Sequence, residues 1–238
     1  MTTVRVGVEW LNHFPPSGSA CHQNTLDYCD DRAHGFIAAM GGHGHTRVFE
    51  WSDDNAWETD FRHPDFGGNS LNWSDNVHFC YFADHGGNGS NVFSVAFSHA
   101  HDSCSGSASQ WRLGARMLKW FVADTCDAVL NTNGSHIVAT WAGPMQGAHI
   151  VFGFIGTSAD SWWTDDVGSD FGDDAGGGSR LSNAWLDRAY SWWTGDKPIA
   201  IAAGESQADA VNRRENETIN WRDLPARSTS WLAWKWRS

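Results

Sequence analysis

The chain has 238 residues, of which 41% are hydrophobic and 18% charged, with 28 acidic and 16 basic side chains. This composition excludes global disorder, and the length suits one domain with a substantial core. The formal net charge of −12 argues against a nucleic-acid backbone or an anionic membrane as the main partner.

Strands and helices are expected to alternate along the chain. In the first third of the chain, the apolar periodicity predicts a strand at 4–12, a helix at 26–40, a strand at 46–51 and a long polar connection at 52–75. Strands are then predicted at 76–83, 91–99, 117–126, 136–142 and 149–158, followed by a polar insert at 161–179 that is rich in glycine and aspartate. The last part is predicted to form a helix at 181–192, a strand at 197–206, a helix beginning at Ser206 and a strand at 228–237. This alternation predicts a single α/β domain over residues 1–238, built as three layers with a mostly parallel central sheet and helices on both faces.

The N-terminal sequence and the cysteines bear on the compartment. The opening MTTVRVGVEW lacks a basic region followed by an apolar one, and no apolar run approaches the roughly 20 residues that span a bilayer. We therefore expect a soluble, cytoplasmic protein. The five cysteines form no CxxC pair, so we expect neither a disulfide framework nor a structural zinc site, and at least one free thiol.

Reactive residue types follow two of the apolar runs. VHFCYFA leads into Asp84, His85, Gly86 and Gly87, and LKWFVA leads into Asp124, Thr125 and Cys126. In open parallel sheets, reactive side chains collect just beyond the carboxyl ends of the strands. The 41 residues that separate His85 from Cys126 allow the two strands to be neighbours.

A histidine beside a cysteine is the combination that thiol chemistry needs. The thiolate is the nucleophile, and the imidazole accepts its proton and later protonates the leaving group. The N–H groups of Gly86 and Cys126 are expected to form an oxyanion hole. Asp84, Asp124 and Gly87 are candidates for orienting the site or contacting the substrate. The pattern predicts a hydrolase or acyl-transfer enzyme that uses a His85–Cys126 dyad.

The two motifs resemble a known family. An apolar strand with His-Gly, followed by an apolar strand with an acidic residue, a small residue and Cys, is the pattern of caspase-like (clan CD) cysteine peptidases, which include caspases, legumains, clostripain and gingipains. ADHGG is similar to the legumain version and ADTC to the acidic-small-Cys ending, although Thr125 replaces the usual Ala or Ser. The resemblance covers about residues 70–160 and implies a caspase/hemoglobinase-like fold with His85 as base and Cys126 as nucleophile.

Two alternatives stay open. The 16 tryptophans could line a hydrophobic pocket of a biosynthetic enzyme or small-molecule binder. His-x-His pairs at 41–45 and 99–102 could bind a metal, although no companion ligand follows at standard spacing. The aspartates of 161–179 do not match an EF-hand. We expect no cofactor and no metal, a peptide or small molecule as substrate, and no nucleic-acid or membrane partner; the oligomeric state is left open.

Overall fold

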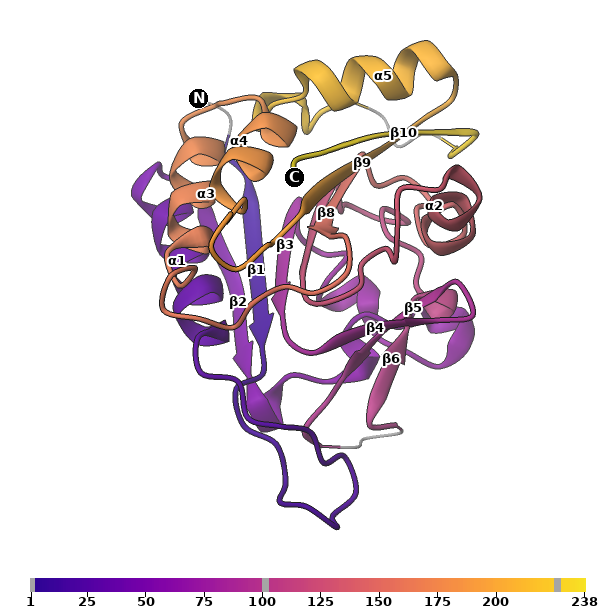
Figure 1. Cartoon of the computed structure of the whole chain (residues 1–238). Helices are drawn as coiled ribbons and strands as arrows, with labels where there is room; N and C mark the ends of the chain where they lie inside the picture. Colours follow the sequence, from indigo (N-terminus) through magenta and orange to yellow (C-terminus); the bar gives the residue numbers. More distant parts are fainter. Residues whose placement is uncertain (1–2, 100–102, 225–227) are drawn as a thin grey trace.

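The computed structural model describes residues 3–99, 103–224 and 228–238 and has a central mixed β-sheet (Figure 1). Within these residues the sheet has seven strands. From one edge to the other they are β10 (Trp231–Trp236), β9 (Pro198–Gly204), β8 (Ile150–Phe154), β7 (Trp120–Asp124), β3 (Phe79–Ala83), β1 (Arg5–Trp10) and β2 (Thr46–Ser52).

The strands β2, β1, β3, β7 and β8 run parallel, whereas β9 is antiparallel to β8, and β10 to β9. All five residues of β3, of β7 and of β8 are buried. This burial on both faces explains their nearly continuous apolar sequences. The predicted mostly parallel α/β sheet is confirmed.

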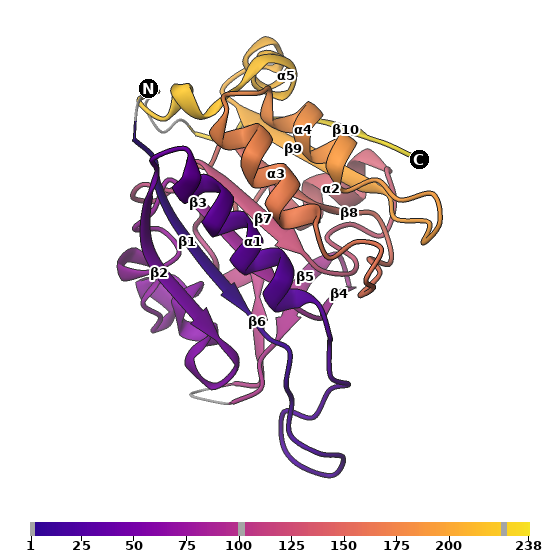
Figure 2. The ribbon, with the colours of Figure 1, turned by 90° about the vertical axis from the view of Figure 1, so that its left-hand side faces the viewer.

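Five α-helices surround the sheet in the described part of the chain. They are α1 (Cys29–Gly42), α2 (Gly134–Trp141), α3 (Val167–Gly176), α4 (Leu181–Arg188) and α5 (Gln207–Asn216). Figure 2 shows α1, α3 and α4 together over one face, and their apolar side chains share a core with Val8, Tyr81 and Val122. The helix expected to begin at Ser206 is confirmed, and the Ser206 hydroxyl accepts the Asp209 N–H at 3.2 Å as its N-cap.

The other face of the sheet is covered by α2 and by a second, smaller sheet. This sheet has the order β4 (Gly86–Gly89), β5 (Val92–Ala96) and β6 (Ser105–Ser107), and its strands are antiparallel. The strand predicted at 91–99 therefore belongs to this layer and not to the central sheet. The predicted long connection at 52–75 is confirmed and contains the 3₁₀ turns Asp53–Asn55, Glu58–Asp60, Pro64–Phe66 and Ser70–Asn72; two further turns are Ala108–Gln110 and Ile219–Trp221.

The insert expected as a polar loop at 161–179 instead contains helix α3. Its glycines serve helix packing, because α3 crosses α1 so closely that side chains would not fit. A Cβ on Gly168 would lie 1.8 Å from the Arg32 carbonyl oxygen, and one on Gly172 would lie 2.8 Å from the Phe36 carbonyl oxygen. The expectation of a loop was wrong because glycine indicates a turn in isolation, whereas here it permits contact between two helices.

The segment HIVATWA, expected as a strand at 136–142, forms helix α2. The Asn133 side chain accepts hydrogen bonds from the N–H groups of Ser135 and His136 and caps the helix. Ile137, Thr140 and Trp141 are buried at helical spacing. The β-branched composition was misleading, and the cap decides the local structure.

No helix in the described part of the chain is long and apolar enough to cross a membrane.

Phe61 lies at the centre of the aromatic core beneath the small sheet. Its ring centroid is 4.8 Å from that of Phe82 and 5.6 Å from that of Trp111. Phe61→Ala should lower the free energy of unfolding by about 3–5 kcal/mol, because it leaves a cavity in a close-packed core. The same truncation at exposed Phe66 should cost about 1 kcal/mol or less. Urea unfolding of both variants measures the difference, and equal losses would contradict this account of the core.

Candidate active site

The two sequence motifs meet at the carboxyl edge of the central sheet. Strands β3 and β7 pair in parallel, with Ala83 opposite Asp124, and the Asp84 N–H donates to the Asp124 carbonyl oxygen at 3.3 Å. The prediction that the two strands are neighbours is confirmed.

His85 and Cys126 both line a small pocket at this edge, with a volume of about 30 Å³. A space of this size holds about one water molecule. The residues that line it are Leu26, Cys29, Arg32, Asp84, His85, Asp124, Thr125, Cys126, Ser158 and Asp160.

The carbonyl oxygen of Asn24 orients the imidazole of His85. His85 Nε2 lies 2.7 Å from this oxygen, and the Phe14 ring lies beside the imidazole with its centroid at 5.4 Å. A carbonyl oxygen can only accept a hydrogen bond, so Nε2 carries the proton. In the neutral ring, Nδ1 is then the unprotonated nitrogen that can act as a base.

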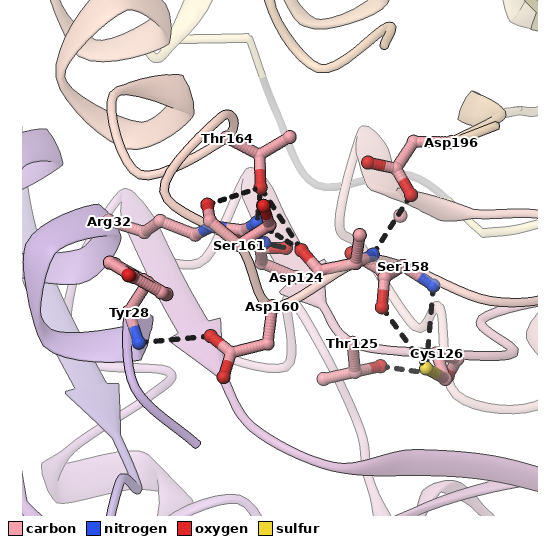
Figure 3. Close-up of polar contacts among 12 residues, drawn as sticks. Tyr28, Arg32, Asp124, Thr125, Cys126, Ser158, Asp160, Ser161, Thr164 and Asp196 are labelled. Atoms are coloured by element: carbon pink, nitrogen blue, oxygen red, sulfur yellow. Dashed lines mark hydrogen bonds and ion pairs between the residues drawn. The ribbon is translucent and has the colours of Figure 1, made fainter. Parts of the chain in front are cut away.

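The sulfur of Cys126 is half-buried and contacts the backbone of Ser158. The Ser158 N–H donates to Sγ at 3.4 Å, and the Ser158 carbonyl oxygen lies 3.5 Å from Sγ (Figure 3). Burial raises the pKa of the Cys126 thiol, and the Ser158 N–H opposes this effect. The thiol is therefore protonated at neutral pH, and a nucleophilic reaction requires a base to remove its proton.

Gly86 brings the two strand ends together. A Cβ at this position would lie 2.3 Å from Thr125 Oγ1 and 2.4 Å from the Cys126 carbonyl oxygen, so no larger residue fits without a shift of the backbone. His85, Gly86 and Gly87 also line a groove of about 230 Å³ over the small sheet. The groove extends from the pocket edge to Gln23 and Cys104.

Asp124 and Arg32 form a buried ion pair below the pocket. Arg32 Nη1 donates to Asp124 Oδ1 at 2.9 Å, and the Tyr81 hydroxyl donates to Asp124 Oδ2 at 2.6 Å. The other arm of the guanidinium donates to the Ala159 carbonyl oxygen and to Thr164 Oγ1 (Figure 3). Asp124, which the sequence offered as an orienting or substrate-contacting residue, thus has a partner on each oxygen.

Three further carboxylates differ in environment: Asp84 and Asp160, which line the pocket, and Asp196, which does not. Asp84 is buried, neither of its oxygens has a well-formed hydrogen bond within the described residues, and burial raises its pKa well above the ordinary value. Asp160 is exposed and accepts the N–H groups of Asp27 and Tyr28, which precede α1. Asp196 accepts the Ala159 N–H at 2.9 Å and the Thr194 hydroxyl at 2.7 Å, which ties the segment after β8 to the one before β9.

Sequence reasoning missed Arg32, Asn24, Ser158 and Asp160. Only Arg32 carries a signal, because it lies three residues after Cys29 and four before Phe36, on the apolar side of the predicted helix. A charged residue there has to find a buried partner. The other three act mainly through backbone groups or loop positions, which sequence periodicity does not indicate.

Four exposed tryptophans contact one another, and two of them closely follow the pocket residue Asp160 in sequence. The tetrapeptide Ser-Trp-Trp-Thr occurs at 161–164 and again at 191–194. The rings stack in the order Trp162, Trp163, Trp193, Trp192, with centroid distances of 3.7, 6.1 and 3.8 Å. We call this group the tryptophan ladder. Each ring is more than half exposed.

Cys21 and Cys104 form a disulfide, which corrects the expectation, drawn from the cysteine spacing, that the chain has no disulfide framework. They are 83 residues apart, and sequence spacing gives no indication that they meet. The disulfide joins the loop between β1 and α1 to the chain just before β6. Cys29, Cys80 and Cys126 are free, so the expected free thiol is confirmed.

The histidine pairs considered for a metal are engaged elsewhere or only partly described. His43 Nε2 lies 2.8 Å from Asp173 Oδ1, and His45 Nδ1 accepts the Val4 N–H. The second pair includes His101, which lies outside the described residues. Among the residues that are described, no group of three or more His, Cys, Asp or Glu side chains is arranged to hold a metal ion.

Residues 8–236 match the model of a family described as "Domain of unknown function (DUF6345)". The chain belongs to this family. A search among curated proteins finds no significant match.

The buried ion pair gives a stability prediction. Arg32→Ala should lower the free energy of unfolding by about 3–5 kcal/mol, because it leaves the Asp124 carboxylate buried without its partner. Adding Asp124→Asn should recover part of this loss. Arg188 forms exposed pairs with Asp170 and Asp174, so Arg188→Ala should cost about 1 kcal/mol or less. Chemical denaturation of the variants tests this order, and an equal loss at both arginines would contradict it.

The buried Asp84 gives a pH prediction. Its folded-state pKa is raised, so above about pH 4 the unfolded chain releases this proton while the folded chain retains it. This group therefore makes stability fall as pH rises from about 4 toward the raised pKa. Asp84→Asn should gain stability relative to wild type between pH 5 and pH 8, whereas Asp187→Asn, at an exposed position, should not. A pH-independent difference in unfolding free energy for Asp84→Asn would contradict the prediction.

Proposed function

We propose that the protein is a cysteine-nucleophile hydrolase or acyl-transfer enzyme, peptidase-like, with Cys126 as nucleophile and His85 as base. The observation that carries the proposal is that both side chains line one pocket at the carboxyl ends of adjacent parallel strands. This edge is where open α/β sheets place reactive groups.

The proton positions support these roles. The Asn24 carbonyl holds the proton on His85 Nε2, so Nδ1 is available as a base. Because burial raises the pKa of Cys126, thiol deprotonation and attack are coupled. The thiol proton passes to the imidazole as Sγ bonds to the acyl carbon, and it then passes to the leaving group as that group departs. Water, or another acceptor, cleaves the resulting thioester and regenerates the thiol.

The oxyanion hole is part of the same proposal. The contact of Gly86 with the Cys126 backbone keeps these two residues adjacent, and their N–H groups are our candidates for binding the developing oxyanion. The groove beside His85, Gly86 and Gly87 offers space for an extended acyl chain. The tryptophan ladder is a stacking surface near the segment that contributes Ser158 and Asp160 to the pocket.

The caspase-like relationship is proposed on the same residues. Its support is the order of the motifs along the chain, with His85 after β3 and Cys126 after the neighbouring strand β7. Two alternatives stay predictions. One is a biosynthetic enzyme or small-molecule binder with a tryptophan-lined pocket, and the other is a metal-dependent enzyme.

A cytoplasmic location also stays a prediction, and the disulfide weighs against it. Disulfides persist in oxidising compartments and are rare in the cytosol. The Cys21–Cys104 disulfide therefore favours an oxidising environment.

Covalent labelling tests the dyad. A peptidyl chloromethyl ketone should modify the wild-type chain at Cys126, and Cys126→Ala should abolish labelling. His85→Ala should slow labelling at neutral pH by about a hundredfold or more, because the protonated thiol loses its base. Cys80→Ala is the matched control, since Cys80 is fully buried in β3, does not line the pocket and should not affect the rate. Intact-mass spectrometry measures the rates, and unchanged labelling in Cys126→Ala or His85→Ala would refute the dyad.

A further inference from the structure

A second, tryptophan-lined hollow lies at the end of β2. Its lining residues are Trp51, Asn55, Trp57, Asp60 and Trp73, and its volume is about 160 Å³. Trp51 belongs to β2, and the other four residues belong to the connection that follows. None of the five lines the pocket that contains His85 and Cys126.

Two of the indole rings form walls nearly at right angles. The centroids of Trp51 and Trp73 are 5.4 Å apart, and their planes are inclined by 82°. Phe49 packs edge-on against Trp73 at 6.0 Å, and Trp57 Nε1 donates to the Asp54 carbonyl oxygen at 2.7 Å. These contacts fix the positions of Trp73 and Trp57. The three rings are only half-buried, so they present aromatic surface to the hollow.

A buried carboxyl group, which has no ion pair with a basic side chain among the described residues, completes the hollow. Asp60 is only 2% exposed, and its Oδ1 has no hydrogen-bond partner within the described residues. The pKa of Asp60 is raised to about 7, because burial raises it most, the Trp57 N–H opposes this effect, and nearby Glu58 adds to it. Glu9 on β1 is fully buried and lies within electrostatic reach of Asp60. Neither of its oxygens has a well-formed hydrogen bond in the described part of the chain, although the Trp57 N–H acts to lower its pKa. A buried carboxyl group without a cation is favoured in its neutral form, so a positive group in the hollow would stabilise the ionised form of Asp60 and be bound by it.

The shape and chemistry of the walls restrict which cation fits. Aromatic faces attract a cation through their quadrupole, and cages of such faces recognise quaternary ammonium groups. A bare ammonium is strongly hydrated and needs several hydrogen-bond acceptors, which three indoles do not provide. A methylated ammonium has an apolar surface and needs none. The hollow could hold several water molecules at about 30 Å³ each, and so a compact head of five heavy atoms.

We propose that Trp51, Trp57, Trp73 and Asp60 form an aromatic cage that binds a methylated ammonium head group. The acidic net charge of the chain raises the local concentration of cations and favours their entry. This site does not depend on the proposed thiol chemistry, because it shares no lining residue with that pocket.

Calorimetric titration of the full chain with choline tests the cage. The matched control ligand is 3,3-dimethylbutan-1-ol, in which a carbon replaces the quaternary nitrogen and the shape is preserved. Choline should bind about tenfold more tightly or better, because only the cation interacts with the ring quadrupoles and with Asp60. Equal binding of the two ligands, or no binding of choline, would overturn the proposal.

Single-residue variants test whether choline binds in this hollow. Asp60→Asn keeps the shape and removes the charge, and it should weaken choline binding by about tenfold. Trp73→Ala should weaken it at least as much, and circular dichroism checks that each variant is folded. Trp193→Ala, in the tryptophan ladder, should bind choline like wild type, as should Cys126→Ala. Normal binding in Asp60→Asn, or loss of binding in Trp193→Ala, would overturn the assignment, and neither result bears on the dyad.

Discussion

The ion pair between Arg32 and Asp124 is the interaction on which the reactive edge of the sheet depends. Asp124 ends β7, Tyr81 belongs to the neighbouring strand β3, and Arg32 comes from the first turn of α1. The guanidinium also binds Ala159 and Thr164 and so holds the segment after β8 (Figure 3). Two strands, a helix and a loop are thus fixed by one carboxylate and one guanidinium. A charged pair is suited to holding several elements in place, because its hydrogen-bond donors and acceptors fix the direction of each contact, which apolar packing does not.

The sequence was most informative where local pattern and tertiary packing agree. Apolar runs indicate β3, β7 and β8 because burial on both faces requires them, and parallel pairing then makes the ends of β3 and β7 adjacent. The sequence pattern was misleading for α2 and α3. In α2 an asparagine cap overrides the amino-acid composition, and in α3 the contacts between helices do so. The Arg32 and Asp124 pair and the Cys21–Cys104 disulfide join residues 92 and 83 positions apart. No local periodicity reports such contacts, so only the fold reveals them.

The abundance of tryptophan has more than one physical basis. Trp111, Trp120, Trp141 and Trp185 are fully buried and fill the two cores. Trp51, Trp57 and Trp73 are half-buried around an acidic hollow. The four rings of the ladder are mostly exposed and contact one another. The indole ring suits all three environments, because it combines a large apolar surface with a polar N–H and an electron-rich face.

The disulfide has a consequence for the loop that orients His85. Cys21 is three residues from Asn24, whose carbonyl oxygen determines which nitrogen of His85 carries the proton. The crosslink restricts this loop and, with it, the carbonyl oxygen that orients the imidazole. Neither cysteine belongs to the central sheet. The pairing of the central strands therefore does not hold this loop, and the geometry at His85 is supported by a covalent bond outside the sheet.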